Sequence, residues 1–351
     1  MALSKSQASI WGKARSLGAG GQAVSLTDEM CAYLVGCIAV DLGLHKAFPE
    51  VPRNLAEFYS KEPLTSLVLP VVDCDALYER LVTKNSDTDV YFACLAALHK
   101  ARLKYERILS TQPIPTLEQV GPRGLLQYGQ LGGRALNAWL FWRKWFFDID
   151  NRAGQETGYL FEPIIAYAIG GTPAPAKKSP VKRHTDPDKG RQVDCILKKR
   201  AYEFKIRVTI AASGQGRWQE ELDFPVDCRQ SGFTPVLVCM DSTPNPKLDA
   251  LIRAFRAQKG EVFVGDAAWA HLEQAAGKTM SIFLEKYVRT PIQDLLAHAK
   301  NELPELTAKW SEHSIDIRVA GETLRIARQP GVAEDEADTM PEDAADEIGA
   351  P

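Results

Sequence analysis

The sequence has no long hydrophobic run and no paired cysteine motif. Its longest apolar stretch, residues 30–40, stops at Asp41 and is too short to cross a bilayer. The seven cysteines form no Cys-x-x-Cys pair, and the first residues lack the basic and then apolar pattern of a signal peptide. These absences predict a cytoplasmic protein with free, buried thiols and no membrane partner.

Motifs of several common enzyme classes are also missing. There is no Gly-x4-Gly-Lys-Ser/Thr phosphate loop and no Gly-x-Ser-x-Gly element, and the six histidines have no zinc spacing. Residues 18–23 imitate a dinucleotide-binding glycine pattern, but no apolar strand precedes them. We therefore expect no nucleotide cofactor and no zinc site.

Charge is unevenly distributed along an otherwise ordinary globular composition, which is 45% hydrophobic. The 45 acidic residues include eight in 331–351, where Lys and Arg are absent, so the remaining 37 are outnumbered by 42 Lys and Arg. A slightly basic body is compatible with a polyanionic partner. We predict a helical N-terminal region (1–151), a region containing strands (152–330) and an acidic disordered tail (331–351).

Hydrophobic periodicity predicts helices in the first half of the chain and a mixture of strands and helices in the second. The expected helices are 28–44, 74–84, 90–109, 131–147, 158–169, 217–227, 247–258, 266–276 and 279–301. The expected strands are 192–197, 201–211 and 234–240, with a closing hairpin at 314–319 and 323–327. Residues 172–191, rich in Pro, Lys and Arg, read as a loop. The fold class is α/β.

The most informative segment is 201–210, AYEFKIRVTI, in which apolar and polar residues alternate. Because alternate side chains of a strand point to opposite faces, Glu203, Lys205 and Arg207 should project together while the apolar residues pack inward. Taken alone, this pattern is equally typical of an antiparallel strand with one solvated face.

Two further acids, Asp194 and Glu162, stand in apolar surroundings, where an unpaired charge is costly to bury. A hairpin of the two strands could place Asp194 beside Glu203. Three converging carboxylates suit Mg²⁺, and a nearby lysine can orient water and stabilise charge during phosphodiester hydrolysis. Two rival acids remain open, namely the Asp186-Pro187-Asp188 segment in place of Asp194 and Glu156 in place of Glu162.

With Glu162 on a helix, Asp194 on a strand and Glu203-Phe204-Lys205 on the next, the sequence resembles the PD-(D/E)xK nuclease superfamily. More narrowly, GYLFEPIIA, EFKIRVTIAASGQGRWQEEL and TPVLVCMDSTPNPKL resemble the ApaLI-like type II restriction endonucleases. The resemblance implies a restriction-endonuclease-like core, a mixed central sheet flanked by helices, with 152–330 as the catalytic region. One departure is Val193, which stands where the name of the motif has proline.

The resemblance implies Mg²⁺-dependent cleavage of double-stranded DNA at a short palindrome by a homodimer, leaving 5′-phosphate and 3′-hydroxyl ends. Mn²⁺ should substitute, and Ca²⁺ should support binding without cleavage. Asp194, Glu203 and the auxiliary Glu162 would be metal ligands, and Lys205 the catalytic lysine. The alternatives are a structure-selective repair or recombination nuclease and a non-catalytic DNA-binding protein.

Two groups of residues are candidates for DNA contact. Basic residues beside the catalytic strands suit phosphates, and polar residues just after them suit base edges. The first group is Lys182, Arg183, Lys189, Arg191 and Arg207, and the second is Ser213, Gln215, Arg217 and Gln219.

Overall fold

The computed structural model describes residues 3–18, 22–70, 73–85, 87–206, 215–298 and 304–329. Its first half is helical. The elements are α1 (Lys5–Arg15), α2 (Asp28–Asp41), η1 (His45–Ala47), η2 (Leu64–Ser66), α3 (Cys74–Lys84), α4 (Thr88–Thr111), α5 (Leu117–Val120), η3 (Gly121–Leu126) and α6 (Gly133–Ala168).

The second half mixes strands and helices. It comprises β1 (Thr172–Ala174), η4 (Ala176–Lys178), β2 (Lys182–Arg183), β3 (Asp186–Gly190), β4 (Val193–Leu197), β5 (Arg200–Lys205), α7 (Gln215–Gln230), β6 (Thr234–Cys239), α8 (Pro246–Ala257), β7 (Glu261–Val264), α9 (Asp266–Leu284), the π-helix η5 (Glu285–Arg289), α10 (Thr290–Ala297), β8 (Leu306–Trp310), β9 (Ser314–Val319) and β10 (Glu322–Ala327).

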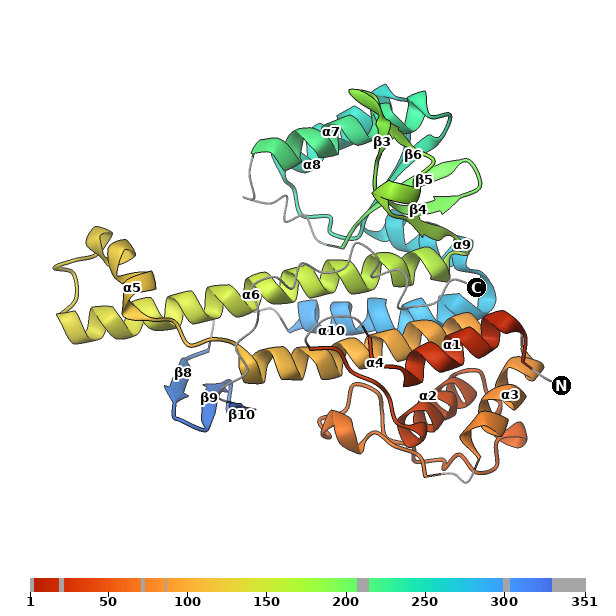
Figure 1. Cartoon of the computed structure of the whole chain (residues 1–351), viewed down its shortest axis with the longest axis horizontal. Coiled ribbons are helices and arrows are strands. Elements are labelled where there is room, and N and C mark those ends of the chain that lie inside the picture. Colours follow the sequence, from red (N-terminus) through yellow and green to blue (C-terminus); the bar gives the residue numbers. More distant parts are fainter. Residues whose placement is uncertain are drawn as a thin grey trace.

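Helix α2 lies at the centre of the N-terminal half. It begins where the Thr27 side chain accepts a hydrogen bond from the backbone N–H of Met30. Most of its residues are buried on all sides, packed among α1, α3 and α4. These helices lie below α6 in Figure 1, on the side away from the central sheet.

Helix α6 connects the two halves and runs unbroken for 36 residues, where the sequence predicts two separate helices. The division expected between residues 151 and 152 falls inside it. Its aromatic first half packs Trp145 against the three-stranded sheet β8–β9–β10. It ends at Ala168 and is followed by Gly170, which has a left-handed φ of 77°, and by Gly171, which lies so close to Cys195 Sγ that a Cβ would not fit.

A five-stranded sheet of order β1-β4-β5-β6-β7 forms the core of the second half. Strands β1, β4 and β5 pair antiparallel, and β5, β6 and β7 pair parallel. Helices α7 and α8 cover one face, and α6 and α9 cover the other (Figure 1). The predicted α/β fold, with a mixed sheet flanked by helices and a helical N-terminal half, is therefore confirmed.

Several local predictions are wrong. Residues 172–191 are not a plain loop, because β1, β2 and β3 lie within them, and Asp186-Pro187-Asp188 belongs to β3. The helices expected at 266–276 and 279–301 are joined through Gly277 and continue as η5 and α10. Strands β7 and β8 were not predicted, since each is short and is defined by pairing with a distant strand.

All seven cysteines are free and buried, as predicted. Among the described residues, no helix has both the length and the apolar character needed to span a bilayer.

Asp41 is a buried charge that links α2 to α4 in the helical half and to η5 in the second half, and its side chain is only 1% exposed. The hydroxyls of Tyr91 and Tyr287 donate to its Oδ2 at 2.8 and 2.7 Å, and Lys286 forms an ion pair with it. Asp41→Ala leaves both hydroxyls without their acceptor, so we expect a loss of about 2–5 kcal/mol in the free energy of unfolding. Chemical denaturation measures this loss. Glu62→Ala, at an exposed position, is the control, and an equal loss in both variants would contradict the prediction.

Candidate active site

Asp194 and Glu203 lie side by side on adjacent strands. In the antiparallel pairing of β4 with β5, Cys195 lies opposite Tyr202; Asp194 directly precedes Cys195, and Glu203 directly follows Tyr202. The Oδ2 atom of Asp194 accepts a hydrogen bond from the backbone N–H of Phe204 at 2.8 Å. This bond fixes the Asp194 carboxylate against the strand that carries Glu203.

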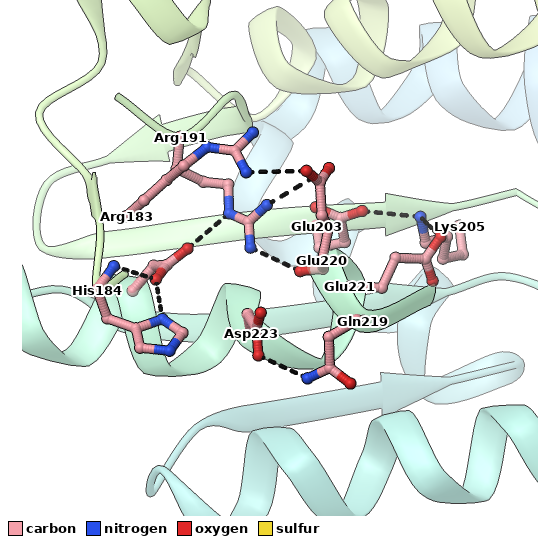
Figure 2. A network of polar contacts seen from close by, with 10 residues as sticks. Arg183, His184, Arg191, Glu203, Lys205, Gln219, Glu220, Glu221 and Asp223 are labelled. Carbon is pink, nitrogen blue, oxygen red and sulfur yellow. Dashed lines mark hydrogen bonds and ion pairs between the residues drawn. The ribbon is translucent and has the colours of Figure 1, made fainter. Parts of the chain in front are cut away.

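The polar face of β5 is not solvated. Tyr202 and Phe204 pack into the core on the opposite face, as their alternation predicts. Glu203 and Lys205 instead lie under α7, and their side chains are 17% and 23% exposed. The Nζ atom of Lys205 lies 2.7 Å from Glu203 Oε1 and 3.5 Å from Glu221 Oε1 (Figure 2). The alternative of a strand with a solvated face is therefore wrong.

A cavity of about 300 Å³ opens at this end of the sheet. Glu162 reaches it from α6, so the structure brings the helix acid to the two strand acids. The lining residues are Glu162, Arg183, Arg191, Gln192, Asp194, Glu203, Glu220, Glu221 and Phe224. Together with Lys205, this set holds five carboxylates against three basic side chains.

Burial and mutual repulsion dominate the electrostatics of the cavity. Burial, and then the charge of Glu203, raises the pKa of Glu162 to about 7, although Lys205 opposes the shift. The pKa of Asp194 is raised well above its ordinary value by burial and by Glu203 and Glu162. Burial lowers the pKa of Lys205, but Glu203, Glu221 and Asp194 outweigh it and raise the pKa overall. Lys205 therefore remains an ammonium group.

The donor set suits a hard divalent cation. Within the described residues, no group of three or more His, Cys, Asp or Glu side chains is already arranged around a metal position. The Lys205 ammonium instead partly neutralises the carboxylates, by pairing with Glu203. The excess of acids and the buried Oε2 of Glu221, which has no hydrogen-bond partner, leave negative charge that a bound cation would neutralise. Glu162, Asp194 and Glu203 thus fit the role of metal ligands.

The two rival acids lie elsewhere. Glu156 is ion-paired with Lys104 and Arg152, each at 3.1 Å, and does not line the cavity. Asp186 is paired with Lys189 at 3.0 Å on the β2–β3 hairpin, also outside the cavity lining. The geometry therefore favours Glu162 and Asp194 over both.

The basic residues expected to contact phosphates fall into two groups. Lys182, Arg183 and Lys189 lie on the β2–β3 hairpin, where Lys182 and Lys189 are exposed. Arg183 is half-buried, with its Nη1 2.9 Å from Glu220 Oε1. Arg191 is buried inside the cavity wall rather than lying on the surface, and Arg207 lies outside the described residues.

The residues expected to read bases are less completely described. Gln219 is exposed on α7, and its Nε2 donates to Asp223 Oδ1 at 2.9 Å. Gln215 and Arg217 occupy the first turn of α7, but their side chains lie outside the described part of the structure. Ser213 lies outside the described residues.

The sequence does not identify three acids on α7 as part of the site. Glu220 and Glu221 line the cavity, and Asp227 pairs with Arg191 in its wall. Asp227 stands in an apolar context, FPVDC, which is the signal that identified Asp194. Glu220 and Glu221 have no such signal, since acids on a helix are normally solvated. Only the packing of α7 over β5 brings them to the cavity.

The fold and the site together define an α/β protein with a restriction-endonuclease-like core. The model of the ApaLI-like restriction endonuclease family matches residues 53–289. The type II restriction enzyme ApaLI of Acetobacter pasteurianus is 47% identical over 281 residues, which cover 74% of each protein. The chain belongs to the ApaLI-like restriction endonuclease family and is thus a site-specific deoxyribonuclease. No solved structure matches it.

The raised pKa of Glu162 has a consequence for stability without divalent metal. Because its folded pKa of about 7 exceeds the ordinary 4.5, the folded state binds more protons between these values. The contribution of Glu162 to the free energy of unfolding therefore falls as pH rises from about 5 to 8. Glu162→Gln removes this loss and should be more stable than wild type at pH 8 by about 1–3 kcal/mol, with little difference near pH 4. Denaturation in EDTA at both pH values measures it, and a pH-independent difference would contradict it.

Proposed function

We propose that this enzyme hydrolyses double-stranded DNA at a short palindromic sequence in a Mg²⁺-dependent reaction that leaves 5′-phosphate and 3′-hydroxyl ends. The observation that carries the proposal is the convergence of Glu162, Asp194 and Glu203 on one cavity, with Lys205 paired to Glu203, in a chain of a restriction endonuclease family. Mn²⁺ should substitute for Mg²⁺, and Ca²⁺ should support binding alone.

In this mechanism Asp194, Glu203 and Glu162 would hold the metal. The bound ion would lower the pKa of a water molecule and offset charge on the phosphorus centre. Since Lys205 stays protonated, it acts as a hydrogen-bond donor and point charge and not as a base. Its place beside Glu203 allows it to orient the attacking water and to stabilise the charge that develops on a phosphate oxygen.

A palindromic target has two equivalent strands to cut. Two active sites related by a two-fold axis match that symmetry, so the working form should be a homodimer. Lys182, Arg183 and Lys189 would contact backbone phosphates beside each site, together with Arg207. Ser213, Gln215, Arg217 and Gln219 would face the base edges. A cytoplasmic setting fits both the DNA substrate and the seven unpaired cysteines.

Digestion of a sequenced plasmid tests the activity itself. With Mg²⁺ we expect discrete double-strand breaks at one repeated sequence, and sequencing of the ends should show 5′-phosphates. With EDTA or Ca²⁺ no cutting is expected. Cutting only at junctions or flaps would indicate a structure-selective nuclease instead, and binding without any cleavage would indicate a non-catalytic DNA-binding protein.

Substitutions test the residue roles. Lys205→Ala and Asp194→Asn should each lower the single-turnover cleavage rate by about 10²-fold or more, because each removes a group that stabilises charge in the transition state. Ca²⁺-supported DNA binding by Lys205→Ala should remain measurable. Matched controls are Lys84→Ala, at an exposed position on α3, and Asp186→Asn, the rival acid. Normal cleavage by Lys205→Ala or by Asp194→Asn would refute the assigned role of that residue.

A further inference from the structure

Arg191 is an arginine buried in the wall of the catalytic cavity. Its side chain is 7% exposed. The Nε atom lies 2.7 Å from Asp227 Oδ2, and Nη2 donates to the backbone carbonyl of Glu220 at 2.6 Å. The remaining nitrogen, Nη1, lies 3.9 Å from Glu220 Oε2, beyond hydrogen-bonding distance. The guanidinium is thus held along one edge while it lines the cavity (Figure 2).

Asp227, the partner of Arg191, is itself fixed from the other side. Its side chain is 1% exposed on α7. The Oδ1 atom accepts the backbone N–H of His184 at 2.7 Å and lies 2.6 Å from His184 Nδ1. Two contacts from His184 and one from Arg191 therefore hold the Asp227 carboxylate in place. Because this carboxylate is fixed, it also fixes the orientation of the Arg191 guanidinium.

Fold stability is a weak reason for such a pair. Buried ion pairs often stabilise a protein no better than apolar residues of the same size, because both charges must be desolvated. Arg191 nevertheless lines the same cavity as Asp194 and Glu162. A guanidinium there is suited to a planar or tetrahedral oxyanion, above all a phosphate, which it can bind with two parallel hydrogen bonds.

We propose that Arg191 binds the scissile phosphate itself, and that Asp227 is the residue that positions it. The inference rests on the proposed DNA cleavage and deepens it. Arg191 approaches the phosphate from the hairpin side and Lys205 from the end of β5. Arg191 donates to non-bridging oxygens and stabilises their charge as the bond to the leaving oxygen breaks. Lys182 and Lys189, which are exposed, contribute only affinity for neighbouring phosphates.

A double-mutant cycle with modified DNA tests the contact. The cognate duplex, identified by the digestion above, carries one neutral methylphosphonate at the scissile linkage, and binding is measured in Ca²⁺ by fluorescence anisotropy. We expect Arg191→Ala to weaken binding to normal DNA on the order of tenfold. The methylphosphonate should then cost the variant about tenfold less than it costs the wild type. Lys189→Ala is the control, and its sensitivity to the neutral linkage should stay complete.

The outcomes separate the two proposals. Wild-type cleavage of the plasmid bears on the proposed function alone. If the wild type cuts and the effects of Arg191→Ala and of the methylphosphonate simply multiply on the cognate duplex, Arg191 does not touch this phosphate and the proposed cleavage stands.

The positioning role of Asp227 has its own readout. In Asp227→Asn the coupling between Arg191 and the scissile phosphate should fall, and single-turnover cleavage at saturating DNA should slow at least tenfold. A merely structural role would lower the melting temperature and leave that coupling intact, which would overturn the assignment. Should Asp227→Asn fail to fold, Arg191→Lys provides the test, since it keeps the charge but loses the paired hydrogen bonds. Wild-type cleavage by this variant would also refute the proposal.

Discussion

The structure depends on keeping several carboxylates close together at one half-buried end of a sheet. Burial and mutual repulsion both favour their protonated forms, as the raised pKa values of Glu162 and Asp194 show. The chain moderates the repulsion with one ammonium group held at short range, that of Lys205 on β5. A cation and a phosphate, the ligands proposed for this site, would offset that cost when bound.

The surrounding architecture serves to hold these opposing charges in fixed directions. The hydrogen bond from the Phe204 N–H holds Asp194 against β5, and the parallel strand β6 buries β5 from its other edge. Helix α7 closes over the polar face and adds its own acids. Asp227 and His184 brace the hairpin side of the cavity. Each charged group therefore has a rigid element behind it, which is the condition for charge stabilisation without reorganisation during the reaction.

Alternation along 201–206 was sufficient to predict which face of β5 carries Glu203 and Lys205, and helical periodicity located α3 at its observed ends. Acids in apolar contexts led to Asp194 and Glu162. Glu220 and Glu221 could not be found in this way, because a helix acid looks solvated until the position of α7 over the sheet is known. The sequence predicts that residues 172–191 form a surface loop and so does not predict that Arg191 is buried. Its burial depends on an ion pair with Asp227, which is distant in the sequence.

Because α6 runs without a break from one half of the chain to the other, the five-stranded sheet and its site do not form a separate domain. Glu162 stands near the end of a helix about 54 Å long whose earlier turns are packed against α4 and the β8–β10 sheet. Transfer of residues 152–330 alone into another protein would divide α6 near residue 152. Glu162 would then lose the packed first half of the helix that holds it in position. A recombinant protein that keeps the activity must therefore contain the helical half as well as the sheet.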